Sequence, residues 1–204
     1  MNKGMTSYIS IGEWLFKILL LNLYWFIFTL LGLVAFGIFP ATAALFATIR
    51  QDIKEEDDVK LFRTFFHYYK KEFLKSNVLG YIIAIATALI LFNIHVLGLM
   101  DASLFKSFMM VMSYILLAII AIVAIFLFPI FVHYQFSFLG YFKYSAILAI
   151  GKPIKTIIML ALVAGVCYFY YSIPGFIPAL GVSLLAYLIM RIAYPTFAQV
   201  AEGA

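Results

Sequence analysis

Charge and cysteine are both scarce in this sequence. Only 11% of its 204 residues are Asp, Glu, Lys or Arg, whereas roughly 25% is usual for a soluble domain. The single cysteine, Cys167, stands inside an apolar run, so the chain can form neither an intramolecular disulfide nor a redox-active cysteine pair. The first scarcity argues against a soluble domain, and the second excludes a disulfide framework.

The sequence also lacks the local patterns that carry catalysis, metal binding or nucleotide binding. His67, His95 and His133 lie far apart, and no His-x-x-x-His or Cys-x-x-Cys spacing offers a metal site. No Gly-x-x-x-x-Gly-Lys loop is present to hold nucleotide phosphates. The interiors of the long apolar runs contain no Asp or Glu, which leaves no obvious proton relay. We therefore expect no catalytic residues, no cofactor, no bound metal and no enzymatic activity.

Apolar sequence, in contrast, is abundant. The chain is 66% hydrophobic, and several runs reach the roughly 18 residues that cross a hydrocarbon core of about 30 Å. This pattern predicts an all-α, polytopic helical membrane protein that forms one domain over residues 1–204, with about five transmembrane helices and one cytoplasmic interfacial amphipathic helix. The predicted spans cover about 16–36, 78–100, 108–132, 154–171 and 176–194, and the interfacial helix covers about 61–76.

A helix break follows the first predicted span. Gly37 and Pro40 interrupt the apolar run, and Ala41–Ile49 is a short apolar helix after the interruption. This short helix either completes the crossing as a bent continuation or dips back as a re-entrant segment. The backbone groups that the break releases require partners from protein or water, because lipid offers none.

The segment Leu61–Lys75 has the pattern of an amphipathic helix at a lipid–water boundary. One face gathers apolar side chains, and the opposite arc gathers cations with His67. We predict that the contacts with lipid or with a membrane partner come from both faces. The predicted residues of this surface are Phe65, Tyr69 and Phe73 on the apolar face, and Arg63, Lys70, Lys71 and Lys75 on the basic face.

The positions of the cations predict the orientation of the spans. With five spans, the cations before the second and fourth spans and at the end of the fifth fall on one side, and Lys106 falls on the other. That arrangement places the carboxyl terminus in the cytoplasm and the amino terminus outside. The alternative is a hairpin over 16–50 that turns near Gly37, which gives six crossings and an internal amino terminus. The net charge of +5 then indicates a basic cytoplasmic face near anionic lipid, and not a nucleic-acid surface.

Three motifs occur in order within the first 80 residues. They are Leu21-Asn22-Leu-Tyr-Trp25, Gly37-Ile-Phe-Pro40-Ala-Thr-Ala-Ala-Leu45, and Phe62-Arg-Thr-Phe65 followed by Lys70-Lys-Glu-Phe73-Leu-Lys-Ser-Asn77. Together they resemble the YesL-like family of small bacterial integral membrane proteins. The resemblance implies a multi-pass protein of the bacterial cytoplasmic membrane, a domain of unknown function, and a frequent association with carbohydrate ABC importers. It also marks Asn22, Trp25, Gly37 and Pro40 as residues of the family motif and the helix break.

Two classes of function fit these observations. The first is an accessory or assembly partner of a membrane complex, possessing a basic surface for anionic headgroups or for a membrane protein such as an ABC permease. The second is a small-solute transporter or channel, acting as an oligomer, with the segment Gly37–Pro40 lining its path. Polar candidates for such a path are few, chiefly Asn22, Thr29 and Thr87. The accessory function is therefore the interpretation that we favour from the sequence.

Overall fold

The computed structural model describes residues 3–54 and 60–202, with side chains described for residues 12–54 and 60–197. Within these residues the chain contains helices and connecting turns, and no strand. The elements are α1 (Lys3–Leu31), α2 (Ile38–Lys54), α3 (Leu61–Lys71), α4 (Phe73–Leu99), α5 (Leu104–His133), α6 (Phe138–Gly151), α7 (Pro153–Ser172), the 3₁₀ turn η1 (Pro174–Phe176) and α8 (Ile177–Glu202).

Five of these helices are long and apolar enough to cross a membrane, namely α1, α4, α5, α7 and α8. Their apolar segments overlap all five predicted spans, so the prediction of an all-α, multi-pass membrane protein is confirmed. Two predicted boundaries are wrong. The first span ends at Leu31 and not at residue 36, because the chain turns there. The predicted helix 61–76 is interrupted at Glu72, which separates α3 from the long helix α4.

The helices α1 and α2 form an antiparallel hairpin. Leu33 and Val34 adopt the left-handed conformation in the turn, with φ of 55° and 63°. Further from the turn, Trp25 Nε1 donates a hydrogen bond of 3.0 Å to Thr42 Oγ1. The helices α1 and α2 therefore run side by side in opposite directions, which favours the hairpin over a bent continuation of one span.

The far ends of the same two helices meet through an ion pair. Lys17 Nζ lies 2.7 Å from Asp52 Oδ1. Residue 17 is near the start of the first membrane-length segment, and residue 52 lies in the last turn of α2. The ion pair places the start of this segment and the end of α2 at the same end of the hairpin, which fits the alternative of a hairpin over 16–50 and not a bent continuation through Gly37 and Pro40.

The hairpin turn depends on close contact between its backbone segments. A Cβ atom on Gly37 would lie 2.3 Å from the carbonyl oxygen of Thr29, and one on Gly32 would lie 2.3 Å from the Cα of Gly37. No side chain fits at such distances. The two glycines therefore allow the ends of α1 and α2 to approach each other, and Pro40 follows in the first turn of α2, where a proline is tolerated.

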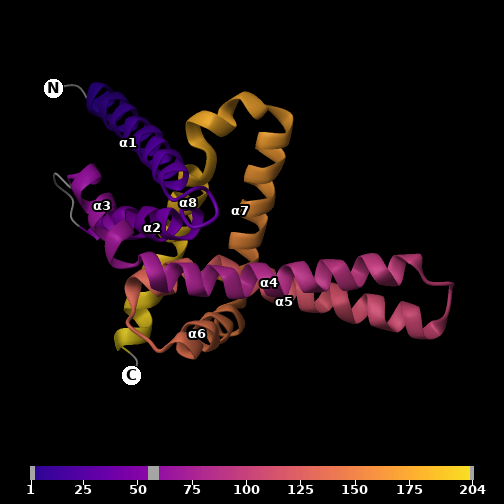
Figure 1. Cartoon of the computed structure of the whole chain (residues 1–204). Coiled ribbons are helices and arrows are strands. Elements are labelled where there is room, and N and C mark those ends of the chain that lie inside the picture. Colours follow the sequence, from indigo (N-terminus) through magenta and orange to yellow (C-terminus); the bar gives the residue numbers. More distant parts are fainter. Residues whose placement is uncertain (1–2, 55–59, 203–204) are drawn as a thin grey trace.

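The helix α2 is the centre of the fold. It packs against α1, α3, α4, α5 and α8, and Figure 1 shows it close to the point where the other helices meet. The helix is covered by its neighbours on more than one side, since Ala44 and Leu45 are fully buried and Ile49 is 1% exposed. Gly80 on α4 leaves room for the ring of Phe39, because a Cβ at Gly80 would lie 2.1 Å from that ring.

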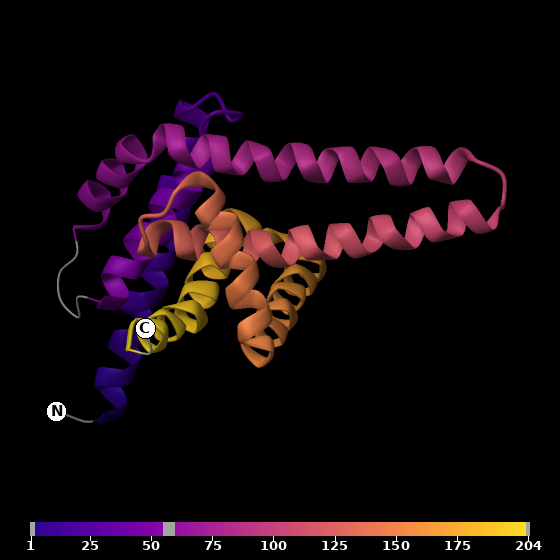
Figure 2. The same ribbon diagram turned by 90° about the horizontal axis from the view of Figure 1, so that it is seen from below.

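The helices α4 and α5 form a long hairpin that extends away from this centre. We call residues 82–119 of this hairpin the arm. Figures 1 and 2 show the arm projecting beyond the other helices, with the turn between α4 and α5 at its far end, and α7 leaving the centre in a different direction. Large apolar side chains are exposed on both helices of the arm, among them Leu89, Phe92 and Phe108. Within the arm, Ser113 Oγ donates to Asn93 Oδ1 at 2.9 Å.

The helix α8 contains a second break, at Gly181, whose φ is 21°. Asn22 of α1 stabilises this break, because its Nδ2 donates a hydrogen bond of 2.8 Å to the carbonyl oxygen of Pro178. Ser183 Oγ donates to the carbonyl oxygen of Ile18 at 2.9 Å, and the Tyr170 hydroxyl donates to that of Gly181 at 2.7 Å. The backbone groups released by the break thus find protein partners, as the low-dielectric surroundings require.

Candidate functional site

The helix α3 joins the packed centre to the start of α4, and its inner face packs tightly against α1. The side chains of Phe65 and Tyr69 are 0% and 9% exposed. Their rings lie 5.2 and 4.9 Å from the ring of Phe28 on α1. The Tyr69 hydroxyl donates to the carbonyl oxygen of Phe28 at 3.0 Å. Burial raises the pKa of this hydroxyl, so it stays protonated and remains a donor.

The placement of Phe65 and Tyr69 on a lipid or partner surface is therefore wrong. The sequence period identified the apolar face correctly, but this face packs on the hairpin of α1 and α2 and not on the surroundings. Phe73 is half-buried and lies beside Tyr69, with ring centroids 5.6 Å apart. These three aromatic side chains anchor α3, and they leave the opposite side of the helix for external contacts.

The exposed side of α3 combines aromatic and basic side chains. We call it the outer face of α3. Phe62 and Phe66 are 56% and 38% exposed, and their rings stack with an interplanar angle of 4°. Lys70 Nζ lies 4.4 Å above the ring of Phe66, which is a cation–π geometry. The face consists of Phe62, Arg63, Phe66, His67, Lys70 and Lys71.

An open hollow of about 480 Å³ lies along this face, lined by Arg63, Phe66, His67, Lys70 and Lys71. Three of the four predicted cations, Arg63, Lys70 and Lys71, are thus brought together. Lys75 is exposed but belongs to α4, beyond the interruption at Glu72. Phe62 and Phe66 were not among the residues predicted for this surface. At 100° per residue, Phe66 lies at the edge of the apolar arc next to Lys70, which was a signal, whereas Phe62 lies within the arc and gave none.

The motif residues near the helix break have structural roles. Asn22 is 5% exposed and holds the break of α8, as described above. Trp25 bonds Thr42, whose own hydroxyl donates to the carbonyl oxygen of Ile38. Gly37 lies in the hairpin turn, and Pro40 is buried at the start of α2. All four residues therefore join α1 to α2 or α8.

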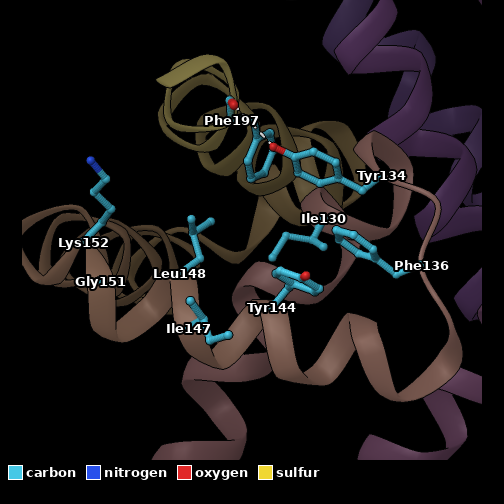
Figure 3. A pocket seen from close by; sticks show the side chains of 9 residues that line it. All are labelled: Ile130, Tyr134, Phe136, Tyr144, Ile147, Leu148, Gly151, Lys152 and Phe197. Atoms are coloured by element: carbon cyan, nitrogen blue, oxygen red, sulfur yellow. Dashed lines mark hydrogen bonds between the residues drawn. The ribbon is translucent and has the colours of Figure 1, made fainter. Parts of the chain in front are cut away.

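A separate cavity of about 250 Å³ lies between the end of α5, α6 and α8. Figure 3 shows aromatic rings from α8 and from the segment after α5 around it, with Tyr144 of α6 stacked on Phe136, and Ile147 and Leu148 further along α6. The Tyr134 hydroxyl donates to the carbonyl oxygen of Phe197 at 3.3 Å. Apart from tyrosine hydroxyls, its one ionisable side chain is Lys152, so the cavity offers apolar contact and no acid–base pair.

Among the residues that the structure describes, no three His, Cys, Asp or Glu side chains are grouped in a way that would hold a metal ion. The chemistry of the outer face of α3 is therefore that of cations and aromatic rings. Such a surface binds anionic groups, aromatic rings or the headgroup region of a membrane.

Comparison with known proteins gives the family. A model of the family described as "Protein of unknown function, DUF624" matches residues 18–94. The chain is also 36% identical over 191 residues to the uncharacterized protein YteU of Bacillus subtilis, with 93% of this chain and 85% of that protein covered. The chain belongs to the DUF624 family.

Two more relatives from Bacillus subtilis support this assignment. The uncharacterized protein YesV is 35% identical over 182 residues, which cover 89% of this chain and 86% of that protein. The uncharacterized protein YesL is 30% identical over 184 residues, which cover 90% of this chain and 86% of that protein. The resemblance to the YesL-like family is thus confirmed. No solved structure matches the chain.

Proposed function

We propose that this DUF624 protein is an accessory or assembly partner of a membrane complex, and that the outer face of α3 is its docking surface. The observation that carries the proposal is the division of α3 into two faces. Phe65 and Tyr69 fix the helix to the centre of the fold, while Phe62 and Phe66 contact α1 with one side of their rings and stay partly exposed beside the cations. A docking surface on a fixed helix loses little conformational freedom on binding.

The composition of the outer face supports a protein partner. Aromatic side chains and arginine are enriched in the cores of protein interfaces, and here Arg63 and Phe66 line the same hollow. Anionic lipid headgroups are the other expected partner, because lysines beside a membrane are attracted to them. In the proposed topology, α3 and the carboxyl terminus lie on the cytoplasmic side of the bacterial cytoplasmic membrane. By the YesL-like resemblance, the expected partner is a carbohydrate ABC permease or its ATPase.

A photocrosslinking residue at Phe66 tests this proposal in native membranes. We expect a crosslink to a subunit of an ABC importer, identified by mass spectrometry, and a loss of this crosslink in the double variant Lys70→Gln, Lys71→Gln. The same photoreactive residue at Tyr171, which is 86% exposed at the end of α7, is the matched control. Crosslinks to lipid alone at position 66 would contradict a protein partner and leave membrane anchoring as the role of this face.

A small-solute transporter is the second candidate, and one observation favours it. The break of α8 at Gly181 borders a cavity of about 600 Å³ between α1 and α8, lined by Asn22, Leu23 and Trp25 among others. Broken helices mark binding sites in many transporters. However, the donor of Asn22 is already engaged by Pro178, and most of the other lining side chains are apolar.

Flux into liposomes that contain the protein alone separates the two candidates. We expect no solute flux, because the accessory function requires a partner. Saturable flux that disappears in Leu23→Trp would instead favour the transporter, since this change fills the cavity without touching the hydrogen bond of Asn22. Circular dichroism and gel filtration of the variant would establish that it is folded.

A further inference from the structure

A small polar cavity lies where α2, α3 and α5 end. Its volume is about 120 Å³, well above the roughly 15 Å³ that one water requires. Arg50 contributes from α2, Lys71 and Glu72 from the junction of α3 and α4, and His133 from the end of α5. The remaining lining residues are Tyr68, Phe131, Val132, Tyr134 and Gln135. The cavity is separate from the outer face of α3, although Lys71 borders both.

Two buried nitrogen atoms at this cavity have no hydrogen-bond partner among the described residues. They are Nε of Arg50 and Nδ1 of His133. Leaving a buried donor unpaired is costly, and native proteins almost always supply a partner, either from protein or from a bound molecule. Both atoms belong to residues that line one cavity, so the polar groups around this cavity are not fully paired within the described part of the protein.

The charges at the cavity select an anion. Arg50 and Lys71 are cations, and Glu72 is the one carboxylate among the lining residues, 4.0 Å from Lys71 Nζ. The nearby Asp52 is engaged by Lys17 at 2.7 Å. A guanidinium, an ammonium and an imidazole N–H are donors of the kind that hold oxyanions through several charge-assisted hydrogen bonds.

The position of the cavity narrows the choice of anion. It lies at the carboxyl end of α5 and next to the start of α4, two of the membrane-length helices. The ends of membrane spans lie at the depth of lipid headgroups, and basic pockets between such helices bind headgroup phosphates. We propose that this cavity binds a phosphate group, with Arg50 and His133 as direct donors and Lys71 as the supporting cation. The phosphate comes from an anionic lipid or from solution, and the recognition chemistry is the same.

Binding to the full chain in a non-ionic detergent tests the proposal. The probes are inorganic phosphate and dihexanoyl phosphatidylglycerol, and dihexanoylglycerol is the probe without phosphate. The readout is the apparent Kd from ligand-dependent thermal stability. We expect Arg50→Gln to weaken binding at least about tenfold, because a charge-assisted hydrogen bond is lost.

Three further variants make the test specific. Arg63→Gln removes the same charge from the exposed outer face of α3 and should leave the apparent Kd nearly unchanged. Glu72→Gln removes the competing carboxylate and should tighten binding. If Arg50→Gln fails to fold, His133→Gln, which is expected to weaken binding for the same reason, is measured in its place.

The outcomes are distinct. Binding of phosphatidylglycerol alone supports the proposal with a lipid source, and binding of inorganic phosphate supports it with a soluble source. The proposal is overturned if neither probe binds, or if dihexanoylglycerol binds as well as phosphatidylglycerol. It is also overturned if Arg63→Gln weakens binding as much as Arg50→Gln or its replacement His133→Gln. None of these results depends on whether the outer face of α3 docks on another protein.

Discussion

The helix α2 and the arm of α4 and α5 are both helical and apolar, yet their surroundings are opposite. Nine of the ten residues of α2 from Pro40 to Ile49 are buried by other parts of the protein. On the arm, Leu89 is 63% and Phe92 is 66% exposed. The buried helix is rich in alanine and contains two threonines, whereas the exposed helices consist largely of Ile, Leu, Val and Phe.

This difference shows that an apolar helix of a membrane protein can face either lipid or other parts of the protein. In a membrane protein, large apolar side chains are equally compatible with lipid and with protein, so they do not drive helices together. Small residues allow close approach between helices, and they mark the contacts inside the protein. The alanines of α2, among them Ala41, Ala44 and Ala47, are therefore better indicators of the centre of the fold than the long apolar runs are.

The largest effect that we expect comes from a charge placed in the centre. Phe65→Asp buries a carboxylate at a position that is 0% exposed, and we expect it to cost more than about 4 kcal/mol and to prevent folding. Phe66→Asp is the matched control, because Phe66 is the next residue of the same helix and its side chain is 38% exposed. The measurement is the yield of monodisperse protein in gel filtration, together with thermal unfolding. Similar yields for both variants would show that α3 does not pack on the centre.

The next effect compares one leucine from each region. Leu45→Ala leaves a cavity in α2, where the side chain is fully buried, and we expect a loss of about 2–5 kcal/mol in the free energy of unfolding. Leu89→Ala on the arm should change it little, because lipid surrounds this side chain before and after the helices associate. Reversible unfolding in a bilayer-like medium measures both. A large loss at Leu89 would mean that the arm packs against protein.

A smaller effect is expected at the hairpin turn. Gly37→Ala introduces a Cβ that would lie 2.3 Å from the carbonyl oxygen of Thr29, so the turn has to shift, at a cost of about 1–3 kcal/mol. Gly98→Ala is the control near the end of the arm, where nothing lies within 4 Å of the added atom, and its higher helix propensity should be neutral or slightly stabilising. Melting temperatures of the two variants provide the test, and equal melting temperatures would contradict the close approach of α1 and α2.

The sequence predicted the helical membrane class and all five membrane-length helices, because length and apolarity are local properties. It did not predict the direction of the chain after the first span. Gly37 and Pro40 mark an interruption, but the reversal also requires Leu33 and Val34 in the left-handed conformation, which ordinary residues rarely adopt. The contacts that fix the reversal, such as that of Lys17 with Asp52, join residues far apart in the sequence.

The candidate site shows the same limit. Helical periodicity separates the two faces of α3, but it does not distinguish burial by protein from contact with lipid, so Phe65 and Tyr69 were assigned to the wrong surroundings. The cavity at Arg50 and His133 gives no local signal either. Its residues come from three elements whose meeting is a property of the fold, and a sequence pattern records only near neighbours.

The smallest effect concerns the one described hydrogen bond that joins two side chains of the arm. Ser113 Oγ lies 2.9 Å from Asn93 Oδ1 and 2.8 Å from the carbonyl oxygen of Met109. We expect Ser113→Ala to lower the free energy of unfolding by about 0.6 kcal/mol, the average for hydrogen bonds between membrane helices. The effect is small because the serine hydroxyl finds its own helix carbonyl even when α4 and α5 separate.

Ser183→Ala provides the comparison from the centre, because Ser183 is fully buried. Its hydroxyl also donates to two carbonyl oxygens, that of Ile18 on α1 and that of Leu180 on its own helix. Unfolding of both variants in the same bilayer-like medium measures the difference. If the arm lies in lipid, the two losses should agree within about 1 kcal/mol, because neither hydroxyl has water as an alternative partner. A loss above about 2 kcal/mol for Ser113→Ala alone would mean that the arm is packed against a further protein surface, where relaxation around the missing hydroxyl is restricted.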